Sequence, residues 1–482
     1  MKKTTTAVLL IAMLAACASC GESGTAVETT AGTDTTVPAV EETTESIAPK
    51  FEPKDFGGVD FNIVSTVSGY DEGDNWFIAE EENGDTLNDA VYKRNVIVEE
   101  TLNVNLTYEQ IVQLNMAQPL LEAAMAGDDC YHLALTHQMN GLSTMVVENL
   151  LIDFQKIPYI DFSKPYWNQS CNEAMEIGGH QYYAVSEFMK VNTYGIYFNK
   201  RLIEEFKLES PYDLVWSGDW TLDKMMEMAN GVAKDLNGDT TMDYQDQYGF
   251  SSLQDYWISM FIWGSDIRLC APDTLELTLM SERTITLFEK LYTLIHESGS
   301  SYMWTFDTHT SKPEQKMLIT SGRVLFTPNS IGTMVNYRDS DVDFGIVPMP
   351  KFDKAQEDYA GVNWNGMMCV PITVQDTEMV GMVTELLSYH SGEIVRPAYY
   401  DTLLGTKLVR DEEMRDMIAF MFDHIVYDAG MSYFGQAGAM QDMYYAPMRL
   451  IGEQKSKDFA SYYAARVDAC NSQIADFLNA IK

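Results

Sequence analysis

The fold is decided between residues 59 and 137, a segment that opens with "VDFNIVST" (59–66) and closes with "YHLALTH" (131–137). In the first stretch Val59, Phe61 and Ile63 alternate with polar residues, which is the period of a half-buried strand. The second stretch is a short apolar run of the kind found in buried strands. Both stretches are therefore predicted to be β-strands.

Two helices and a further strand are predicted between these strands. The stretch "DTLNDAVYKRNVIVEETLNV" (85–104) repeats apolar residues near helical spacing, "VNLTYE" (104–109) reads as a strand, and residues 116–125 form an apolar helix. Strands that alternate with helices predict an α/β protein with mostly parallel sheets flanked by helices. Such sheets bind ligands at the carboxyl ends of their strands.

The first 17 residues have the pattern of a secretory signal. Lys2 and Lys3 form a basic start, residues 7–16 are apolar, and the apolar run is too short to span a membrane. The tetrapeptide Leu-Ala-Ala-Cys (14–17) resembles a bacterial lipobox, which implies that Cys17 is lipidated and becomes the new N-terminus. The alternative is a plain signal peptide with an incidental cysteine. Acyl chains would hold the protein at a membrane surface.

Residues 18–52 are predicted to be a disordered stalk. From residue 21 to residue 50 the chain is rich in Thr, Glu, Ser, Gly and Pro and has no aromatic residue, so it cannot bury enough surface to become ordered. The roughly 430 residues that follow exceed one simple core, and two lobes are expected.

The charge of the chain limits its partners. The formal net charge is −39, and loss of Lys2 and Lys3 with the signal would make it −41. This charge argues against nucleic acid and against anionic lipid as direct binding partners. Once the signal and the anchor Cys17 are set aside, the remaining cysteines show neither a CxxC pair nor metal-ligand spacing, so no disulfide scaffold is indicated. We expect an extracytoplasmic protein that touches the membrane through its lipid anchor only.

Several weak motifs occur in a consistent order from about residue 55 to the end. They are "GDTLNDAVYKRN" (84–95), "GHQYYAV" (179–185), "YFNK" (197–200), "DWTLDK" (219–224), "SGRVLFTPNSIGTMVNYRDSDVDFGIVPMPKFD" (321–353) and "GVNWNGMMCVPITVQDTEMVGMVTELLSYHS" (361–391). This order resembles the extracellular solute-binding proteins of ABC importers, in the large sugar-binding class. Two departures concern the ligand: the loop "ESPYDLVWSGDWTL" (209–222) is longer than usual, and Ser186-Glu187 stands where proline is common.

The resemblance implies a two-lobed periplasmic-binding-protein-like fold whose hinge is crossed about three times. By analogy the crossings lie near Val185, Arg323 and Ser391, and the lobes close on ligand. The first lobe would hold residues 53–186 and 323–390, and the second lobe would hold residues 187–322 and 391–482.

The acidic stretch "KDLNGDTTMDYQDQYGF" (234–250) matches the ligand spacing of an EF-hand. Positions 1, 3, 5, 7, 9 and 12 of that spacing are Asp235, Asn237, Asp239, Thr241, Asp243 and Asp246. Thr240 stands at position 6, where glycine is usual. A structural calcium ion is predicted, and a solvated acidic loop is the alternative. The resemblance supports calcium, because importer-binding proteins often carry a similar insertion.

Aromatic and amide side chains in loops are the candidates for ligand binding, because sugars stack on aromatic rings and bond to planar polar groups. Trp364 lies between Asn363 and Asn365 and suits a hydroxylated ligand; packing between lobes is the alternative. The resemblance implies that Tyr444 or Tyr445 contributes an aromatic ring to the cleft. The further candidates are Asn329, Glu187 in the hinge segment, His137 and Gln138 at the end of the third strand, and Trp76 after the first strand.

Catalytic signatures are missing from the sequence. There is no HExxH, GxSxG, Walker or Rossmann motif, and the seven histidines are scattered. A surface glycoside-processing enzyme needs only two facing carboxylates, so it stays as an alternative, as does a binder of peptides. We expect a monomeric, non-enzymatic solute-binding protein that delivers a mono- or oligosaccharide to the permease and ATPase of an ABC importer.

Overall fold

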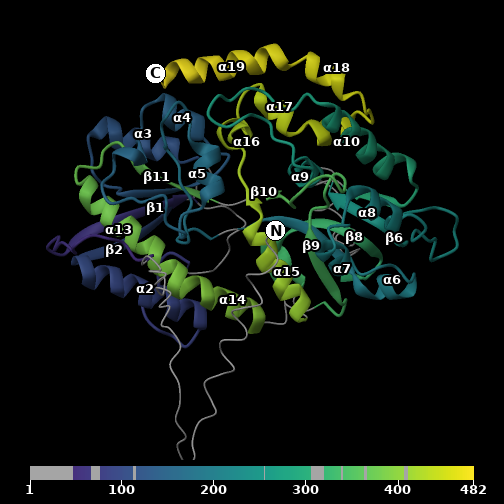
Figure 1. Ribbon diagram of the computed structural model, residues 1–482, viewed down its shortest axis with the longest axis horizontal. Coiled ribbons are helices and arrows are strands. Elements are labelled where there is room, and N and C mark those ends of the chain that lie inside the picture. Colours follow the sequence, from purple (N-terminus) through teal and green to yellow (C-terminus); the bar gives the residue numbers. More distant parts are fainter. Residues whose placement is uncertain are drawn as a thin grey trace, which may run out of the picture. The chain divides into compact units, whose positions relative to one another are not determined.

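The computed structural model describes residues 47–66, 76–111, 115–190, 192–253, 256–304, 320–337, 340–362, 366–405 and 411–481. The predicted signal peptide, Cys17 and most of the predicted stalk lie outside these residues, as do positions 363–365. Residues from Ile47 to Lys482 form one compact unit. It contains two five-stranded sheets and a two-stranded one (Figure 1).

The first sheet has the strand order β2-β1-β3-β11-β4. Its strands are β1 (Val59–Thr66), β2 (Val104–Ile111), β3 (Leu133–His137), β4 (Leu151–Ile152) and β11 (Gly366–Pro371). β1 pairs in parallel with β2 and β3, and Phe61 and Ile63 turn into the core as the alternation predicts. The strands predicted between residues 59 and 137 are confirmed.

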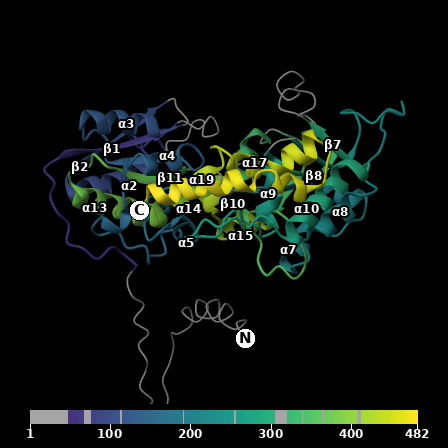
Figure 2. The same cartoon turned by 90° about the horizontal axis from the view of Figure 1, so that it is seen from above.

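Helices cover both faces of this sheet, with α2 and α13 on one side and α3 and α4 on the other (Figures 1 and 2). The helices of this half are α2 (Thr86–Leu102), α3 (Ala117–Ala126), α4 (Leu142–Val147), the short η1 (Phe154–Lys156), α5 (Gln169–Met175), α13 (Thr377–His390), the π-turn η4 (Ser391–Val395) and α14 (Arg396–Gly405). The carboxylate of Asp85 caps α2 by accepting from the amides of Leu87 and Asn88.

The second sheet has the strand order β7-β6-β8-β5-β9. Its strands are β5 (Tyr194–Asn199), β6 (Tyr248–Leu253), β7 (Ser301–Trp304), β8 (Val324–Ser330) and β9 (Phe344–Pro348). Its helices are α6 (Lys200–Glu205), α7 (Pro211–Trp216), α8 (Leu222–Ala229), α9 (Tyr256–Gly264), α10 (Glu282–Tyr292), η2 (Thr293–Glu297), η3 (Ile331–Tyr337) and α15 (Glu412–Asp423). Thr221 caps α8 by accepting from the amide of Lys224.

Each large sheet contains one strand that runs against its neighbours. β11 is antiparallel to β3 and β4, and β5 is antiparallel to β8 and β9. Both strands follow a segment in which the chain passes from one sheet to the other. The remaining ladders are parallel, so the expected α/β architecture holds with these two insertions.

The predicted lobe boundary near Arg323 is wrong. β8 and β9 pair with β5 and β6, so residues 324–348 belong to the second sheet and not to the first. The chain returns to the first sheet later, between β10 (Gly361–Val362) and β11. The boundary placed near Ser391 also moves, because η4 and α14 contact α2 of the first half, whereas α15 contacts β9 of the second.

The C-terminal helices contact both halves. They are α16 (Ala429–Phe434), α17 (Met440–Tyr444), η5 (Pro447–Glu453), α18 (Phe459–Ala464) and α19 (Val467–Ala480). α16 and α19 contact α4 of the first half, and α18 contacts α10 of the second. Among the described residues no helix is long and apolar enough to cross a bilayer.

Candidate ligand cleft and hinge

The ends of the two large sheets meet at the segment between β10 and β11. Gly366, the first residue of β11, pairs with His137, the last residue of β3. On the other side the hydroxyl of Thr193, next to the start of β5, donates to the carbonyl of Val362 at 3.1 Å. Val362 and Gly366 therefore lie at strand ends of the two sheets, where α/β sheets bind ligands. Residues 363–365 lie outside the described ranges, so the roles of Trp364, Asn363 and Asn365 stay predictions.

A two-stranded ladder forms the middle of the hinge. β10 pairs in parallel with β12 (Ile425–Val426), and the amide of Gly361 donates to the carbonyl of His424 at 3.1 Å. A Cβ atom on Gly361 would lie 2.5 Å from Oγ1 of Thr193, so only glycine allows this close approach between two crossing segments.

His137 and Gln138 lie at the carboxyl end of β3, as predicted. The Nδ1 atom of His137 accepts from the amide of Met139 at 3.3 Å, and burial lowers the pKa of His137 to about 4. The imidazole is therefore neutral at physiological pH. Gln138 is completely buried, so its amide does not present itself at an open surface.

Two predicted ligand residues are instead packed inside the protein. Trp76 is 4% exposed, and its indole Nε1 donates to the carbonyl of Phe188 at 2.8 Å. Asn329 is 2% exposed; its amide nitrogen donates to the hydroxyl of Tyr337 and its oxygen accepts from the amide of Ser330, both at 2.9 Å. In this structure both side chains hold neighbouring chain segments and are not turned to an open cleft.

The tyrosine pair in α17 and the residue after it is also part of the packing. Tyr444 is fully buried against Trp263, with ring centroids 5.7 Å apart. Tyr445 is half-buried, and its hydroxyl accepts from the side chain of Gln436 at 2.9 Å. Tyr444 is therefore part of the core in this structure, together with Met440 and Met443 of α17.

Glu187 forms an ion pair with Arg396, which begins α14. Burial raises the pKa of Glu187, while the neighbouring guanidinium acts in the opposite direction. Arg396 also lies 3.6 Å from a carboxylate oxygen of Asp423. This charged group lies beside the hinge. Sequence reasoning missed Arg396 because 209 positions separate it from Glu187.

Arg94 is a second residue that the sequence did not reveal. Its guanidinium is completely buried and makes five hydrogen bonds, to Oδ1 of Asn95, the carbonyls of Trp76 and Phe77, and the hydroxyl of Ser391. Burial lowers the pKa of Arg94 to about 9, so it stays charged at neutral pH. Arg94 therefore connects three segments: residues 76 and 77 before α2, the helix α2 itself, and the junction of α13 with η4 at Ser391.

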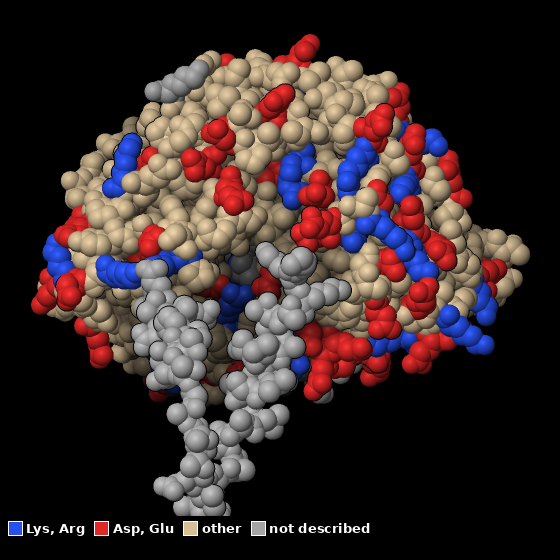
Figure 3. Space-filling view, viewed as in Figure 1, with Lys and Arg blue, Asp and Glu red and all other residues tan. Residues whose placement is uncertain are grey.

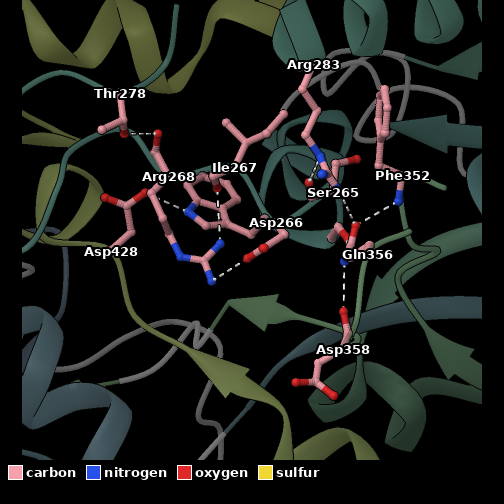
Figure 4. Close-up of polar contacts among 12 residues, drawn as sticks. Ser265, Asp266, Ile267, Arg268, Thr278, Arg283, Phe352, Gln356, Asp358 and Asp428 are labelled. Atoms are coloured by element: carbon pink, nitrogen blue, oxygen red, sulfur yellow. Dashed lines mark hydrogen bonds and ion pairs between the residues drawn. The ribbon is translucent and has the colours of Figure 1, made fainter. Parts of the chain in front are cut away.

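Asp428 joins the hinge strand β12 to the second half (Figure 4). One carboxylate oxygen accepts from the indole of Trp263 at 2.9 Å and from the amide of Leu269 at 2.7 Å, and the other accepts from the amide of Met431 at 3.2 Å. The chain after Leu269 reaches the first half, where the carboxylate of Asp273 accepts from the amide of Gly178 at 3.0 Å.

The acidic loop closes on its own backbone. The carboxylate of Asp235 accepts from the amides of Gly238 and Thr240 at 2.6 and 2.9 Å, and Asp246 accepts from those of Leu236 and Asp243, both at 2.9 Å. These backbone amides lower the pKa of Asp246. Thr240 has a left-handed φ of 70°, the conformation for which an EF-hand uses glycine. Within the described ranges no three His, Cys, Asp or Glu residues are grouped closely enough to hold a metal, so calcium stays a prediction.

Comparison with known proteins gives structural matches only. No protein-family model and no curated protein matches the sequence. A sugar transporter protein from Rhizobium etli in an open conformation is similar over 88% of this chain and 100% of its own, with 15% identity and a TM-score of 0.57. The cyclic α-maltosyl-1,6-maltose-binding protein of Arthrobacter globiformis is similar over 88% of this chain and 99% of its own, with 13% identity and a TM-score of 0.57.

A third match comes from Thermotoga lettingae. It is an ABC transporter solute-binding protein bound with α-D-tagatose, and it is similar over 87% of this chain and 100% of its own, with 11% identity and a TM-score of 0.53. At these identities the likeness concerns the fold. The chain has the two-lobed α/β fold of the solute-binding proteins of ABC transporters.

Proposed function

We propose that the protein captures a mono- or oligosaccharide outside the cytoplasm and delivers it to an ABC importer by closure of its two lobes. The observation that carries the proposal is the meeting of strand ends from both sheets at residues 361–366. A site at these strand ends would lie between the two halves, which suits a binding protein that closes on its ligand.

A sugar ligand is supported by the neighbours and by the sequence of that segment. The matched proteins from Arthrobacter and Thermotoga bind a cyclic maltosyl-maltose and tagatose. In this chain Trp364, between Asn363 and Asn365, offers an aromatic ring and two amides at the same segment. An aromatic face and planar polar groups are what a sugar requires.

The lipid anchor, the importer subunits and the calcium ion of this proposal rest on the sequence alone. Lipidation of Cys17 would tether the protein to the membrane, and a permease and an ATPase would complete the importer. Calcium in the acidic loop would be structural, because the residues of that loop include no catalytic nucleophile.

Calorimetry with a ligand panel tests the proposal. The panel holds glucose, tagatose, maltose, maltotetraose, a cyclic maltosyl-maltose and mixed di- and tripeptides. We expect saturable heat with at least one sugar, and at least a tenfold loss of affinity in Trp364→Ala, because removal of a stacking ring costs one to a few kcal/mol. Trp216→Ala is the matched control, since Trp216 is an exposed tryptophan on α7.

Two results would contradict the proposal. One is binding of peptides with no heat from any sugar. The other is conversion of a bound oligosaccharide into shorter products, which would support the alternative of a glycoside-processing enzyme with paired carboxylates.

A further inference from the structure

The short helix α16 lies at the junction of the two halves and is buried along its whole length. All six of its residues, Ala429–Phe434, are buried. A helix of this size is about 9 Å long. Figure 3 shows an unbroken surface over the C-terminal helices at the top of the molecule, and Figure 1 places α16 below α17 and α19. Because α16 follows the hinge strand β12 after two residues, its contacts affect the angle between the halves.

The N-terminal end of α16 is fixed to the second half. Its capping residue is Asp428, whose buried carboxylate accepts from the indole of Trp263 at 2.9 Å and from the amide of Leu269 at 2.7 Å. Gly430 packs against the same segment, since a Cβ atom there would lie 2.8 Å from Sγ of Cys270 and from Cβ of Leu269. This end of the helix is therefore held by α9 and the chain that follows α9.

The C-terminal end of α16 is fixed to the first half. The hydroxyl of Tyr433 donates to the carbonyl of Met175, the last residue of α5, at 3.1 Å. The ring of Tyr433 packs against that of Tyr183, with centroids 5.7 Å apart. Burial raises the pKa of Tyr433, so its hydroxyl stays protonated and remains a donor at physiological pH.

The end of α5 receives a second contact from the other half. The chain after α9 extends to Asp273, whose carboxylate accepts from the amide of Gly178 at 3.0 Å. Gly178 lies three residues after Met175. This contact is exposed to solvent, whereas the hydroxyl contact of Tyr433 is buried. The buried bond is expected to contribute more, because its loss leaves a carbonyl without a donor and away from water.

We propose that α16 is a strut that sets the angle between the two halves, and that the hydroxyl of Tyr433 is the point at which it holds the first half. A rotation of the halves about any axis other than that of α16 must shift or break one of the two anchors. Asp428 is held by two bonds to the second half and Tyr433 holds the first half with its one hydroxyl, so the Tyr433 bond is expected to break first. Tyr433 is thus a positioning residue that would act on the ligand through the angle of the halves, and this inference rests on the proposed closure of the lobes.

Tyr433→Phe tests this anchor, and Tyr183→Phe is its matched control. Both tyrosines are buried and their rings are neighbours. The hydroxyl of Tyr183 donates to the carbonyl of Leu142 at 2.7 Å, and both of these residues belong to the first half. Each variant therefore loses one buried hydrogen bond and keeps its ring, but only Tyr433→Phe loses a bond between the halves.

Double electron–electron resonance measures the angle as the distance between two spin labels on the full-length protein without sugar. The labels are attached through ketone amino acids at Glu122 on α3 and Glu204 on α6, exposed positions in the first and second half. In Tyr433→Phe we expect the fraction of molecules outside the main distance peak to rise about three- to tenfold, the factor that one buried hydrogen bond supplies. Tyr183→Phe should keep the wild-type distances, although urea denaturation should show a similar loss of stability in both variants.

The proposal is overturned if Tyr433→Phe keeps the distance distribution of wild type, or if Tyr183→Phe changes it equally. Should Tyr433→Phe fail to fold, Trp263→Phe tests the other end of the strut and should widen the distribution. Its control is Trp220→Phe, because the indole of Trp220 donates to the carbonyl of Pro348 at 2.9 Å within the second half. Equal distributions in these two variants would overturn the proposal as well.

The outcome is separable from that of the proposed sugar binding, because no sugar is present. A protein that binds no sugar can still show the shift in Tyr433→Phe. Unchanged distances in a protein that does bind sugar would overturn the strut alone.

Discussion

The carboxylate of Asp428 lies 2.9 Å from the indole nitrogen of Trp263 and links the hinge strand β12 to helix α9. Asp428 is 2% exposed and also accepts from the amides of Leu269 and Met431. Asp428→Asn keeps one acceptor oxygen and turns an NH₂ group toward other donors. We expect it to lower the free energy of unfolding by about 3 kcal/mol, which urea denaturation measures. Asp266→Asn, at an exposed aspartate in the same region (Figure 4), should change it by less than about 0.5 kcal/mol.

The raised pKa of Glu385 predicts how the stability of the protein depends on pH. Burial raises the pKa of Glu385 to about 7, although Tyr166 and Trp167 donate hydrogen bonds to its carboxylate. The folded protein therefore keeps this proton in a range where the unfolded chain has lost it. The contribution of Glu385 to stability is fully present below pH 4.5 and is lost as the pH rises through about 7, by on the order of 2–3 kcal/mol.

Urea denaturation between pH 5 and pH 8 measures this contribution as the difference between wild type and Glu385→Gln. Tyr166→Phe removes a bond to the charged carboxylate, so it should extend the loss of stability to higher pH. The same pH dependence in wild type and in Glu385→Gln would show that another group is responsible.

Arg94 should be much more sensitive to substitution than its neighbour in the helix. Arg94→Met removes the donors from the buried carbonyls of Trp76 and Phe77, and we expect a loss of about 3–5 kcal/mol. Arg94→Lys keeps the charge but cannot reach all the acceptors, so an intermediate loss is expected. Lys93→Met, at an exposed position, should stay within about 0.5 kcal/mol. Similar losses for Lys93 and Arg94 in urea denaturation would refute the assigned role.

Removal of calcium tests the acidic loop. If calcium is bound at 100 times its dissociation constant, it stabilises the fold by about 2.7 kcal/mol, so EDTA should lower the melting temperature by a few degrees. Asp239→Asn should reduce this effect, since the EF-hand spacing makes Asp239 a ligand. An unchanged melting temperature, together with mass spectrometry that detects no bound metal, would favour the solvated loop.

The elements between residues 59 and 137 were predictable because their signal is local. Alternating Phe61 and Ile63 specify a strand, and Asp85 specifies the start of α2 through bonds to residues two and three positions away. The pairing of β8 with β5 joins residues more than one hundred positions apart, and no local pattern encodes it. For that reason the boundary near Arg323 was misplaced.

The candidate site was less predictable than the fold. Aromatic residues outside regular apolar patterns suggested exposure, yet Trp76 and Tyr444 are buried, because packing between segments decides which side chain reaches the surface. The pair of Glu187 and Arg396 depends on two distant segments meeting at the hinge. An arginine in a helix is usually interpreted as a surface residue. Nothing in the sequence around Arg94 therefore indicates that its side chain is buried.

The C-terminal helices contact α4 in one half and α10 in the other. A rotation of one half against the other must therefore shift or bend the C-terminal helices. Their contacts limit the angle through which the two halves can rotate. We expect a wider range of movement between the two halves in a chain that ended before Ala429, because the contacts of these helices would then be absent.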